Sequence, residues 1–458
     1  MNEKVAKYFE KLKGKRIAVL GIGVSNRPLI RMLLARGLTV LACDKTPREN
    51  LDEEVLDLER MGAALHVGDG YLDGVQADVV FRTPGMHPDI PALRQLREDG
   101  AVVTSEMEAF FTVCPCRIIA VTGSVGKTTT TTRISEILRH AGYTVWLGGN
   151  IGTPLLPLAE KMTPSDIAVV ELSSFQLMGM TQSADIAVVT NLAPNHLDVH
   201  KDMAEYIAAK ENVFLHQSSS GKLVVNMDND ITNAFAAKAP GTVEKFSRCS
   251  KPQNGVWLEN GIIYRNGREI MPAADIKIPG VHNIENYMAA ACATEGLASD
   301  DDVDYVARNF GGVEHRIELV RELRGVKYYN DSIASSPSRT IAGLHSFTQK
   351  VILIAGGYDK HIPFDALGPE ICAHVKTLVL CGATADKIRT AVLNAPEYAA
   401  GKPEILEAED LREAVLLAQK AAAAGDIVTL SPACAAFDQF KNFAVRGKTF
   451  KEIVNSLT

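Results

Sequence analysis

A glycine-rich segment with one lysine carries the chemistry that stands out in this sequence. Residues 117–130 read RIIAVTGSVGKTTT, in which an apolar run from Arg117 to Val121 stops at Gly123. A Gly-Lys-Thr triplet then opens a stretch with helical spacing, so the segment predicts a strand, a tight turn and a helix N-terminus. Backbone N–H groups and the positive helix end suit a polyphosphate. The segment therefore predicts a site that binds and consumes a nucleoside triphosphate.

Two side chains of this loop have defined tasks. Lys127 can reach the β- and γ-phosphates, and the Thr128 hydroxyl can ligate Mg²⁺. The strict pattern has a further glycine where this chain has Val121. A glycine-rich turn that binds nothing is the alternative, but strand, glycines, lysine, hydroxyl and helix occur together in the order that the motif requires.

Polar residues follow further predicted strands, at the sheet edge where ligands of parallel sheets bind. Glu171 ends the strand in SDIAVVELSSFQL and is a candidate for Mg²⁺; the alternative is a buried acid paired with a cation. His196, just past the strand in ADIAVVTNLAPNHLDVH, is either a member of this site or a structural histidine. Lys210, in the predicted helix YIAAKENVF, is expected to be a surface lysine on a polar face.

The first part of the chain predicts a second nucleotide-binding element. Residues 16–37 form a predicted strand, glycine turn and amphipathic helix, and the next strand, LTVLACD, ends in Asp44. The turn GIGVSN lacks the third glycine of the dinucleotide fingerprint, but an acid at the end of the second strand fits a ribose contact. A nucleotide-like ligand and an ordinary βαβ turn both fit this pattern.

The composition is typical of a soluble globular protein. Of 458 residues, 46% are apolar and 22% charged, and the formal net charge is −7, which argues against a general nucleic-acid or membrane surface. The N-terminal residues are polar, unlike a signal peptide, and no apolar run is long enough to span a bilayer. The eight cysteines lack metal-ligand spacing and are expected to be reduced and mostly buried in a cytoplasmic protein.

Strand-like and helical runs alternate along the chain, which predicts an α/β fold with parallel sheets in several domains. We place the domains at residues 1–108, 109–312 and 313–458. Segment 241–279 is expected to form a hairpin with an Asn-Gly turn. In the third block KVILIAGGYDK, KTLVLCG and DIVTLSPACAAF are predicted strands. Candidates to line a cleft there are His315, Arg316, Asp331, Ser332 and Lys360, with a solvated surface position as the alternative for Arg316.

Taken in order, the motifs resemble those of the Mur ligases over essentially the whole chain. Singly they are moderate signals, and in this order they are specific. They are GSVGKTTT at 123–130, GGNIG at 148–152, ELSSFQL at 171–177, NHLD at 195–198, AAK at 208–210, GVHNIEN at 280–286, HR at 315–316, NDS at 330–332 and SPACAAFDQFKNF at 431–443. The chain departs from the usual family pattern at Val125, Ile333 and Ala436.

The resemblance implies an ATP-dependent ligase that adds D-glutamate to UDP-N-acetylmuramoyl-L-alanine through an acyl phosphate, a cytoplasmic step of peptidoglycan synthesis. It implies three domains: a Rossmann-like UDP-binding domain, a central P-loop ATPase domain with a mostly parallel sheet, and a C-terminal Rossmann-like domain that binds the amino acid. A monomer is expected, with no nucleic-acid or membrane partner.

The resemblance also implies two Mg²⁺ sites. Glu171 and Thr128 would hold one ion and His196 a second. Lys210 would be carbamylated, and its new carboxylate would steady the metals, which replaces the surface position expected above. Lys127, Glu171, His196 and Lys210 are then the catalytic residues.

Further contacts follow from the same resemblance. ATP would contact Gly123, Ser124, Val125, Gly126, Lys127, Thr128 and Thr129, with Asn283 and Asn286 at the adenine and His315, Arg316 and Asp331 at the ribose and phosphates. The UDP-substrate would contact Val24, Ser25, Asp44, Thr83, Pro84, Gly85, Asn150 and His196. D-Glutamate would contact Ser335, Lys360 and Phe443.

Three alternatives stay open. Folylpolyglutamate synthase-like and diamino-acid-adding ligases belong to the same superfamily; the former start directly with the ATPase domain, and the Asp-Asn-Pro-Arg motif of the latter is absent here. A partitioning-type ATPase switch has a similar phosphate loop, but with a lysine where this chain has Thr122.

Overall fold

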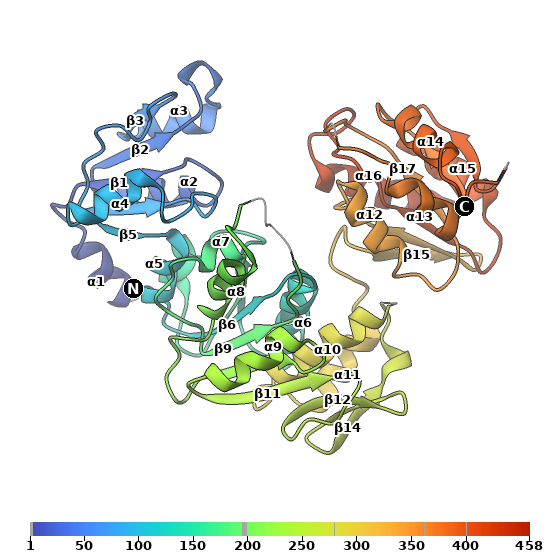
Figure 1. Cartoon of the computed structure of the whole chain (residues 1–458), viewed down its shortest axis with the longest axis horizontal. Coiled ribbons are helices and arrows are strands. Elements are labelled where there is room, and N and C mark those ends of the chain that lie inside the picture. Colours follow the sequence, from blue (N-terminus) through green and yellow to red (C-terminus); the bar gives the residue numbers. More distant parts are fainter. Residues whose placement is uncertain (1–2, 195–198, 279, 361, 400) are drawn as a thin grey trace. The chain divides into compact units, whose positions relative to one another are not determined.

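The computed structural model describes residues 3–194, 199–278, 280–360, 362–399 and 401–458. Its strands form three sheets in which most neighbours are parallel, so the predicted α/β fold with mostly parallel sheets is confirmed (Figure 1). The chain forms two compact units. The first unit contains Met1–Ala273 and Glu285–Val306, and the second unit contains Ala274–Ile284 and Ala307–Thr458.

Two general expectations can be compared with the structure. No helix in the described part of the chain is long and apolar enough to cross a membrane. The eight cysteines are free, and all except Cys249 are buried, as the sequence predicts.

The N-terminal sheet of the first unit has five parallel strands in the order β3-β2-β1-β4-β5. The order reverses between β1 and β4, and such a switch point in a parallel sheet forms a ligand crevice at the carboxyl ends of the strands. The strands are β1 (Ile17–Leu20), β2 (Val40–Asp44), β3 (Ala64–Val67), β4 (Val79–Arg82) and β5 (Val102–Thr104). The helices are α1 (Glu3–Glu10), α2 (Asn26–Leu34), α3 (Glu53–Arg60), α4 (Pro91–Glu98) and α5 (Glu106–Val113), with a 3₁₀ turn, η1 (Arg48–Asn50).

The central sheet of the first unit has the order β14-β13-β12-β11-β10-β9-β6-β8-β7. It is parallel from β7 to β12. Its central strands β6, β8 and β9 are mostly apolar and buried, as in a parallel sheet that is covered on both faces. The strands are β6 (Arg117–Thr122), β7 (Val145–Gly149), β8 (Ile167–Glu171), β9 (Ile186–Val189), β10 (Lys222–Asn226), β11 (Thr242–Ser247), β12 (Gly255–Glu259), β13 (Ile262–Arg265) and β14 (Arg268–Pro272).

Helices follow these strands along the chain. They are α6 (Lys127–His140), α7 (Ser174–Leu177), α8 (Met203–Glu211), α9 (Asp230–Ala234), α10 (Val281–Ala293) and α11 (Asp300–Asn309), with 3₁₀ turns η2 (Leu156–Lys161), η3 (Phe235–Lys238) and η4 (Ala273–Asp275). One buried apolar cluster extends from the N-terminal sheet through Met107 and Phe110 of α5 to Leu156 and the central sheet. This shared core joins the two sheets within the first unit.

The second unit contains a sheet of the order β15-β16-β20-β17-β18-β19, parallel except for the β15–β16 pair. Helices α12, α13 and α14 contribute to an apolar cluster on one face, and α15 and α16 to a cluster on the other. The strands are β15 (Glu318–Leu323), β16 (Val326–Asn330), β17 (Val351–Ala355), β18 (Val375–Leu380), β19 (Glu404–Glu407) and β20 (Ile427–Leu430). The helices are α12 (Pro337–Leu344), α13 (Leu367–His374), α14 (Ala385–Leu393), α15 (Leu411–Ala421) and α16 (Phe443–Ser456).

Segment 241–279 differs from the single hairpin that the sequence predicts. β11 pairs in parallel with β10 and β12, and two successive hairpins follow, β12–β13 and β13–β14. Asn260 and Asn266 both adopt positive φ, 50° and 49°, each before a glycine that does the same. Two-residue Asn-Gly loops of this kind match the twist of antiparallel strands, so each of the two Asn-Gly pairs makes its own turn.

A buried carboxyl connects α5 to the central part of the first unit. Glu106 is 4% exposed and accepts a hydrogen bond from Leu156 N at 3.0 Å. Burial raises the pKa of Glu106 to about 7, and the hydrogen bond from Leu156 N acts in the opposite direction. A carboxyl whose pKa is higher in the folded than in the unfolded chain contributes stability at low pH, and this contribution is lost as the pH rises through the folded-state pKa.

We therefore expect Glu106→Gln to gain stability relative to the parent chain between about pH 5 and pH 8, by up to about 3 kcal/mol. Glutamine keeps an acceptor for Leu156 N and has no charge to bury. Urea unfolding of both chains across this range measures the difference. Glu98→Gln, at an exposed position of α4, is the control and should follow the parent. If the Glu106→Gln and parent curves stay parallel, the buried acid does not titrate here.

Candidate active site

The predicted strand, turn and helix of the phosphate loop are confirmed: β6 leads into the turn and α6 follows it. Gly123 and Gly126 have φ values of 145° and 86°. A Cβ on Gly123 would lie 2.0 Å from Thr190 Oγ1. A Cβ on Gly126 would lie 2.4 Å from Asn286 Oδ1. Both positions therefore require glycine, since the backbone conformation and the lack of space exclude a side chain.

Neighbouring side chains fix the conformation of the loop. Asn191 Oδ1 accepts a hydrogen bond from the backbone N–H of Val125, whose side chain is exposed. Lys127 Nζ donates to the carbonyl oxygens of Gly123 and Ser124, at 2.9 and 3.1 Å. The ammonium group thus lies against the turn that is predicted to hold phosphates. The first turn of α6 also contains the two remaining predicted loop residues, Thr128 and Thr129.

Glu171 ends β8, the strand beside the one that enters the phosphate loop. The parallel register pairs Glu171 with Val121 of β6, which places the carboxyl group at the edge of the sheet where the loop begins. Glu171 is 1% exposed, and its Oε1 accepts from Asn150 Nδ2 at 2.7 Å, whereas Oε2 has no hydrogen-bond partner among the described residues. Burying a carboxylate oxygen is unfavourable unless a donor or a cation satisfies it. The carboxylate of Glu171 and the hydroxyl of Thr128 are both oxygen donors of the kind that Mg²⁺ prefers, and their binding of one common ion stays a prediction.

Lys210 is buried beside the same loop, so the prediction of a surface lysine on a polar face is wrong. Its side chain is 1% exposed, and Nζ donates to Thr122 Oγ1 and to Gly123 O, both at 3.0 Å. In α8, Lys210 lies one turn after the buried Tyr206, whose ring centroid is 5.0 Å from Nζ. At this i, i+4 spacing Lys210 and Tyr206 share the buried face of α8.

The surroundings of Lys210 favour its neutral amine. Burial lowers the pKa of Lys210 well below the ordinary value, and the charge of Lys127 lowers it further, while Glu171 acts in the opposite direction. Lys127 and Lys210 both donate to the carbonyl oxygen of Gly123, so two ammonium groups would otherwise share one point. A buried lysine with a lowered pKa can act as a nucleophile or base near neutral pH.

His196, predicted as a metal ligand and a substrate contact, lies outside the described residues, as do the other residues of NHLD at 195–198. His200 is described and buried. Its ring stacks on Phe175 with centroids 5.3 Å apart, and its Nε2 lies 2.9 Å from Ser174 Oγ. His200 thereby attaches the segment after β9 to α7, a role for which a single histidine in the sequence gives no signal.

The asparagines predicted to face adenine both lie in α10. Asn286 Oδ1 accepts from Thr130 Oγ1 of α6 at 3.2 Å and also limits the space beside Gly126. Asn283 is 3% exposed. Asn286 therefore helps to hold the phosphate loop, and contact of either residue with adenine stays a prediction.

The loops after β1, β2 and β4 meet at the switch point of the N-terminal sheet. Gly21 packs so closely on Thr83 that a Cβ would lie 2.6 Å from Thr83 Cγ2. Asp44 accepts a hydrogen bond from Ile22 N at 2.7 Å. Burial acts to raise the pKa of Asp44, but the hydrogen bonds from Ile22 N and Thr46 lower it below its ordinary value. The predicted UDP-substrate residues on these loops are Val24, Ser25, Asp44, Thr83, Pro84 and Gly85. Asn150 lies elsewhere, on the central sheet beside Glu171.

Arg82, which the sequence analysis did not single out, joins the N-terminal sheet to the central part of the first unit. Its buried guanidinium donates to backbone carbonyls in two places: those of Pro84 and Met86 in the loop after β4, and those of Phe175 and Met178 at α7. Burial lowers the pKa of Arg82 to about 10. Because the acceptors are main-chain oxygens, which every residue type has, the sequence around Arg82 does not indicate its partners.

In the second unit, Asp331 follows β16 and is buried, with Ser431 Oγ 2.7 Å from Oδ2. Burial raises the pKa of Asp331 to about 7, although the hydrogen bond from Ser431 and the charge of Arg316 both act to lower it. Ile317 N donates to Asp331 Oδ1 at 3.3 Å. The structure therefore brings together His315, Arg316 and Asp331, the residues predicted for ribose and phosphates. His315 is buried with φ of 65°, and burial lowers its pKa.

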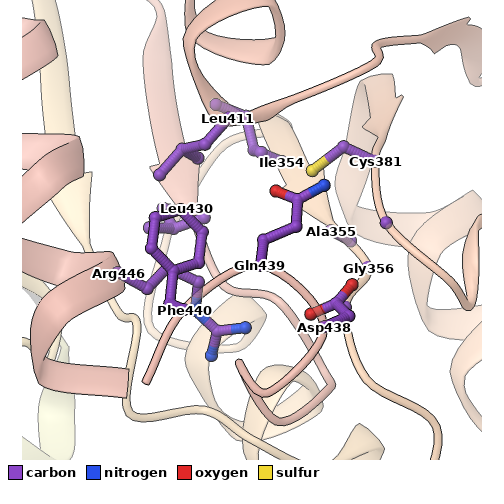
Figure 2. A pocket seen from close by; sticks show the side chains of 12 residues that line it. Ile354, Ala355, Gly356, Cys381, Leu411, Leu430, Asp438, Gln439, Phe440 and Arg446 are labelled. Atoms are coloured by element: carbon purple, nitrogen blue, oxygen red, sulfur yellow. The ribbon is translucent and has the colours of Figure 1, made fainter. Parts of the chain in front are cut away.

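Arg446 of α16 organises the loops at the carboxyl end of the second unit's sheet. Its guanidinium donates to Ser332 Oγ and to the carbonyls of Ser332, Cys434 and Ala435, at 2.9–3.0 Å. Ser332 Oγ donates in turn to Phe443 O at 2.8 Å. Burial lowers the pKa of Arg446 to about 10. Figure 2 shows Arg446 at a small pocket that also contains Asp438, Gln439 and Phe440.

The residues predicted to bind D-glutamate lie on loops that this arginine network holds or, for Phe443, at the start of α16. Ser335 is partly buried a few residues after Ser332, and Phe443 is 38% exposed. Tyr358 N donates to Ala435 O at 3.0 Å, which joins the loop that bears the exposed Lys360 to the segment after β20. The three loops are thus held together, and the individual contacts with D-glutamate stay predictions.

A phosphate loop on a mostly parallel sheet defines the class of P-loop α/β proteins. Residues 121–294 match the Mur ligase middle domain, and residues 315–434 match the Mur ligase glutamate ligase domain. The chain belongs to the Mur ligase family.

Several relatives match the whole chain over their own full length, of which two serve as examples. The chain is 52% identical to the UDP-N-acetylmuramoylalanine--D-glutamate ligase of Acetivibrio thermocellus, and 52% identical to the enzyme of the same name from Clostridium botulinum strain Alaska E43. Among solved structures, UDP-N-acetylmuramate-alanine ligase from Thermotoga maritima aligns with 96% of this chain and 99% of its own. The TM-score is 0.58 at 17% identity, a likeness of fold.

Arg82→Ala should destabilise the first unit by about 2–4 kcal/mol, because buried carbonyls lose a charged donor. Urea unfolding followed by circular dichroism measures the loss. Arg94→Ala, which removes an exposed guanidinium from α4, is the matched control and should unfold like the parent. Equal midpoints for Arg82→Ala and Arg94→Ala would contradict the bridging role.

Proposed function

We propose that this protein is an ATP-dependent ligase that joins the amino group of D-glutamate to the carboxyl group of UDP-N-acetylmuramoyl-L-alanine in the cytoplasm, a step of peptidoglycan synthesis. Full-length relatives of that name at 52% identity support the substrates. The structural observation that carries the proposal is the grouping of Lys127, Glu171 and Lys210 around one phosphate loop.

We infer a division into three domains that act as a monomer: residues 1–108 for the UDP-substrate, 109–312 for ATP and 313–458 for the amino acid. Three separate sheets support this division, as do the two matched domain segments. The Rossmann-like strand order of the N-terminal sheet supports nucleotide binding at its switch point.

In the first step, the terminal carboxylate of UDP-N-acetylmuramoyl-L-alanine attacks the γ-phosphorus of ATP. The bond from that phosphorus to the bridging oxygen breaks, ADP leaves, and an acyl phosphate forms. The backbone N–H groups of the loop and Lys127 neutralise the charge of the transferring group. Glu171 and Thr128 would hold one Mg²⁺ and His196 a second; the ions supply positive charge to the phosphates when bound.

In the second step, the amine of D-glutamate attacks the acyl carbonyl carbon. The tetrahedral intermediate expels inorganic phosphate and loses a proton, which leaves an amide. In our proposal Lys360 pairs with a carboxylate of D-glutamate, since its ammonium is exposed on a loop at the carboxyl end of β17, and Ser335 and Phe443 complete the contacts. Asn283 and Asn286 would contact the adenine, and His315, Arg316 and Asp331 the ribose and phosphates.

We propose further that Lys210 is carbamylated. A neutral amine attacks CO₂, forms an N–C bond and releases one proton, so a lowered pKa favours the reaction. The product places an anion next to Lys127, whose charge stabilises it, and adds carboxylate oxygens near Glu171. This anion would attract a divalent cation, which an ammonium group at Lys210 would repel.

The proposed reaction is tested by phosphate release from ATP with UDP-N-acetylmuramoyl-L-alanine and a panel of D- and L-amino acids. We expect release with D-glutamate and none without the UDP-substrate. Lys127→Ala should lower kcat at least about 100-fold, because it removes a cation from the transferring phosphoryl group. Lys161→Ala, an exposed lysine of η2, is the control. Better turnover with L-glutamate or a diamino acid would overturn the assigned substrate but keep the family.

If Lys210 is carbamylated, we expect an NMR resonance of the carbamate carbon, and we expect a carboxylic acid to restore turnover to a variant without Lys210. In ¹³C-bicarbonate, the parent chain should show a carbamate carbon resonance that is absent in Lys210→Ala. This variant should lose most of its turnover, and a small carboxylic acid such as acetate should restore part of it, because only a carboxylate is missing. Lys161→Ala should keep both the signal and the turnover. An active Lys210→Ala chain, or a resonance that survives the substitution, would exclude the carbamate.

A further inference from the structure

The second unit carries a group of two imidazoles and one carboxylate away from the loops described above. His345 directly follows α12, and Glu370 and His374 lie one turn apart on α13. Glu370 Oε2 is 2.6 Å from His345 Nε2 and 3.5 Å from His374 Nε2. The ligand atoms of all three residues lie within 4.8 Å of one another. We propose that His345, Glu370 and His374 bind a divalent cation of the zinc class.

The spacing of the three ligand atoms matches such an ion. In a tetrahedral zinc site with bonds of about 2.0–2.2 Å, neighbouring ligand atoms are about 3.3–3.5 Å apart. The separation between His374 Nε2 and Glu370 Oε2 has this value. His345 Nε2 lies at hydrogen-bond distance from the same oxygen, and a bound ion would replace this hydrogen bond. The two imidazole rings are inclined by 55° with centroids 4.9 Å apart, so they are not stacked face to face.

The donor set selects the class of ion. Two imidazole nitrogens and one carboxylate oxygen suit Zn²⁺, Ni²⁺ or Cu²⁺, whereas Mg²⁺ prefers oxygen ligands alone. Three protein ligands leave a fourth position for water. The side chains of His345, Glu370 and His374 are 50%, 32% and 34% exposed, so an ion can reach them from solvent. The site is thus distinct in chemistry from the Mg²⁺ sites proposed above.

Both histidines direct a ring nitrogen at one carboxylate oxygen. Oε2 of Glu370 lies 2.6 Å from His345 Nε2 and 3.5 Å from His374 Nε2, so a cation placed between the three groups would be within reach of all of them. The i, i+4 pair on α13 is also a recurrent way to present two metal ligands on one helix face.

The position of the site suggests a stabilising cross-link. The ion would join the end of α12 to the last turn of α13, two helices of the same face of the sheet. Ser335, proposed for D-glutamate, precedes the other end of α12. Occupancy should therefore raise the thermal midpoint of the second unit without being required for turnover.

The full chain, freed of metal by a chelator, is titrated with Zn²⁺ by calorimetry in excess Mg²⁺. We expect a single equivalent to bind and to raise the thermal midpoint. His345→Ala and His374→Ala should each weaken binding more than about tenfold and remove the thermal shift, because each deletes a ligand. His216→Ala, which removes an exposed imidazole from the first unit, is the matched control and should bind like the parent.

Cobalt gives an independent reading of the same site, since the intensity of its visible absorption distinguishes tetrahedral from octahedral coordination. The parent and His216→Ala should show the tetrahedral spectrum, and the other two variants should not. Circular dichroism and basal ligase turnover verify that each variant is folded. Absence of stoichiometric Zn²⁺ binding in the parent, or unchanged binding in His345→Ala and His374→Ala, would overturn the proposal.

Discussion

Two lysine side chains donate hydrogen bonds to one backbone oxygen, that of Gly123, and the chemistry of the first unit depends on this meeting point. Lys127 reaches it from α6 and Lys210 from α8, while the oxygen itself belongs to the turn after β6. The turn packs closely against Thr190, where even a Cβ on Gly123 would find no space. Two like charges at one carbonyl are unfavourable in a buried place. Lys210 is the more buried of the two, so its proton is the one that the site tends to lose.

The same meeting point determines what the neighbouring carboxyl can do. Glu171 presents a buried oxygen without a donor among the described residues, and its other oxygen is occupied by Asn150. A protonated Lys210 near this oxygen would discourage a divalent cation, whereas a neutral or carbamylated Lys210 would admit one. In the proposed function, the charge of Lys210 Nζ would therefore determine whether the loop is prepared for metal and polyphosphate.

Local sequence predicts the phosphate loop well because strand, glycines, lysine and helix start lie within one continuous segment. The position of Glu171 at the carboxyl end of a parallel strand could also be predicted, and its binding of Mg²⁺ stays a prediction. Lys210 could not be assigned from its helix alone: its partners Thr122 and Gly123 are 88 and 87 residues away, and only the resemblance to Mur ligases indicated its role. The roles of Arg82 and Arg446 could not be predicted for another reason, because their acceptors are backbone oxygens that any residue could supply.

Arg82 in the first unit and Arg446 in the second both hold loops in place through hydrogen bonds to main-chain carbonyls. Loops at the carboxyl ends of parallel strands carry the proposed substrate contacts, and loops have few backbone hydrogen bonds of their own. A guanidinium group that donates to several carbonyls fixes the main chain itself, so a loop keeps its shape whichever side chains it bears. Arg82 does this for the loop after β4, and Arg446 for the loops after β16 and β20. Since ordering a loop during binding costs conformational entropy, loops that are fixed beforehand leave more of the interaction free energy for substrate binding.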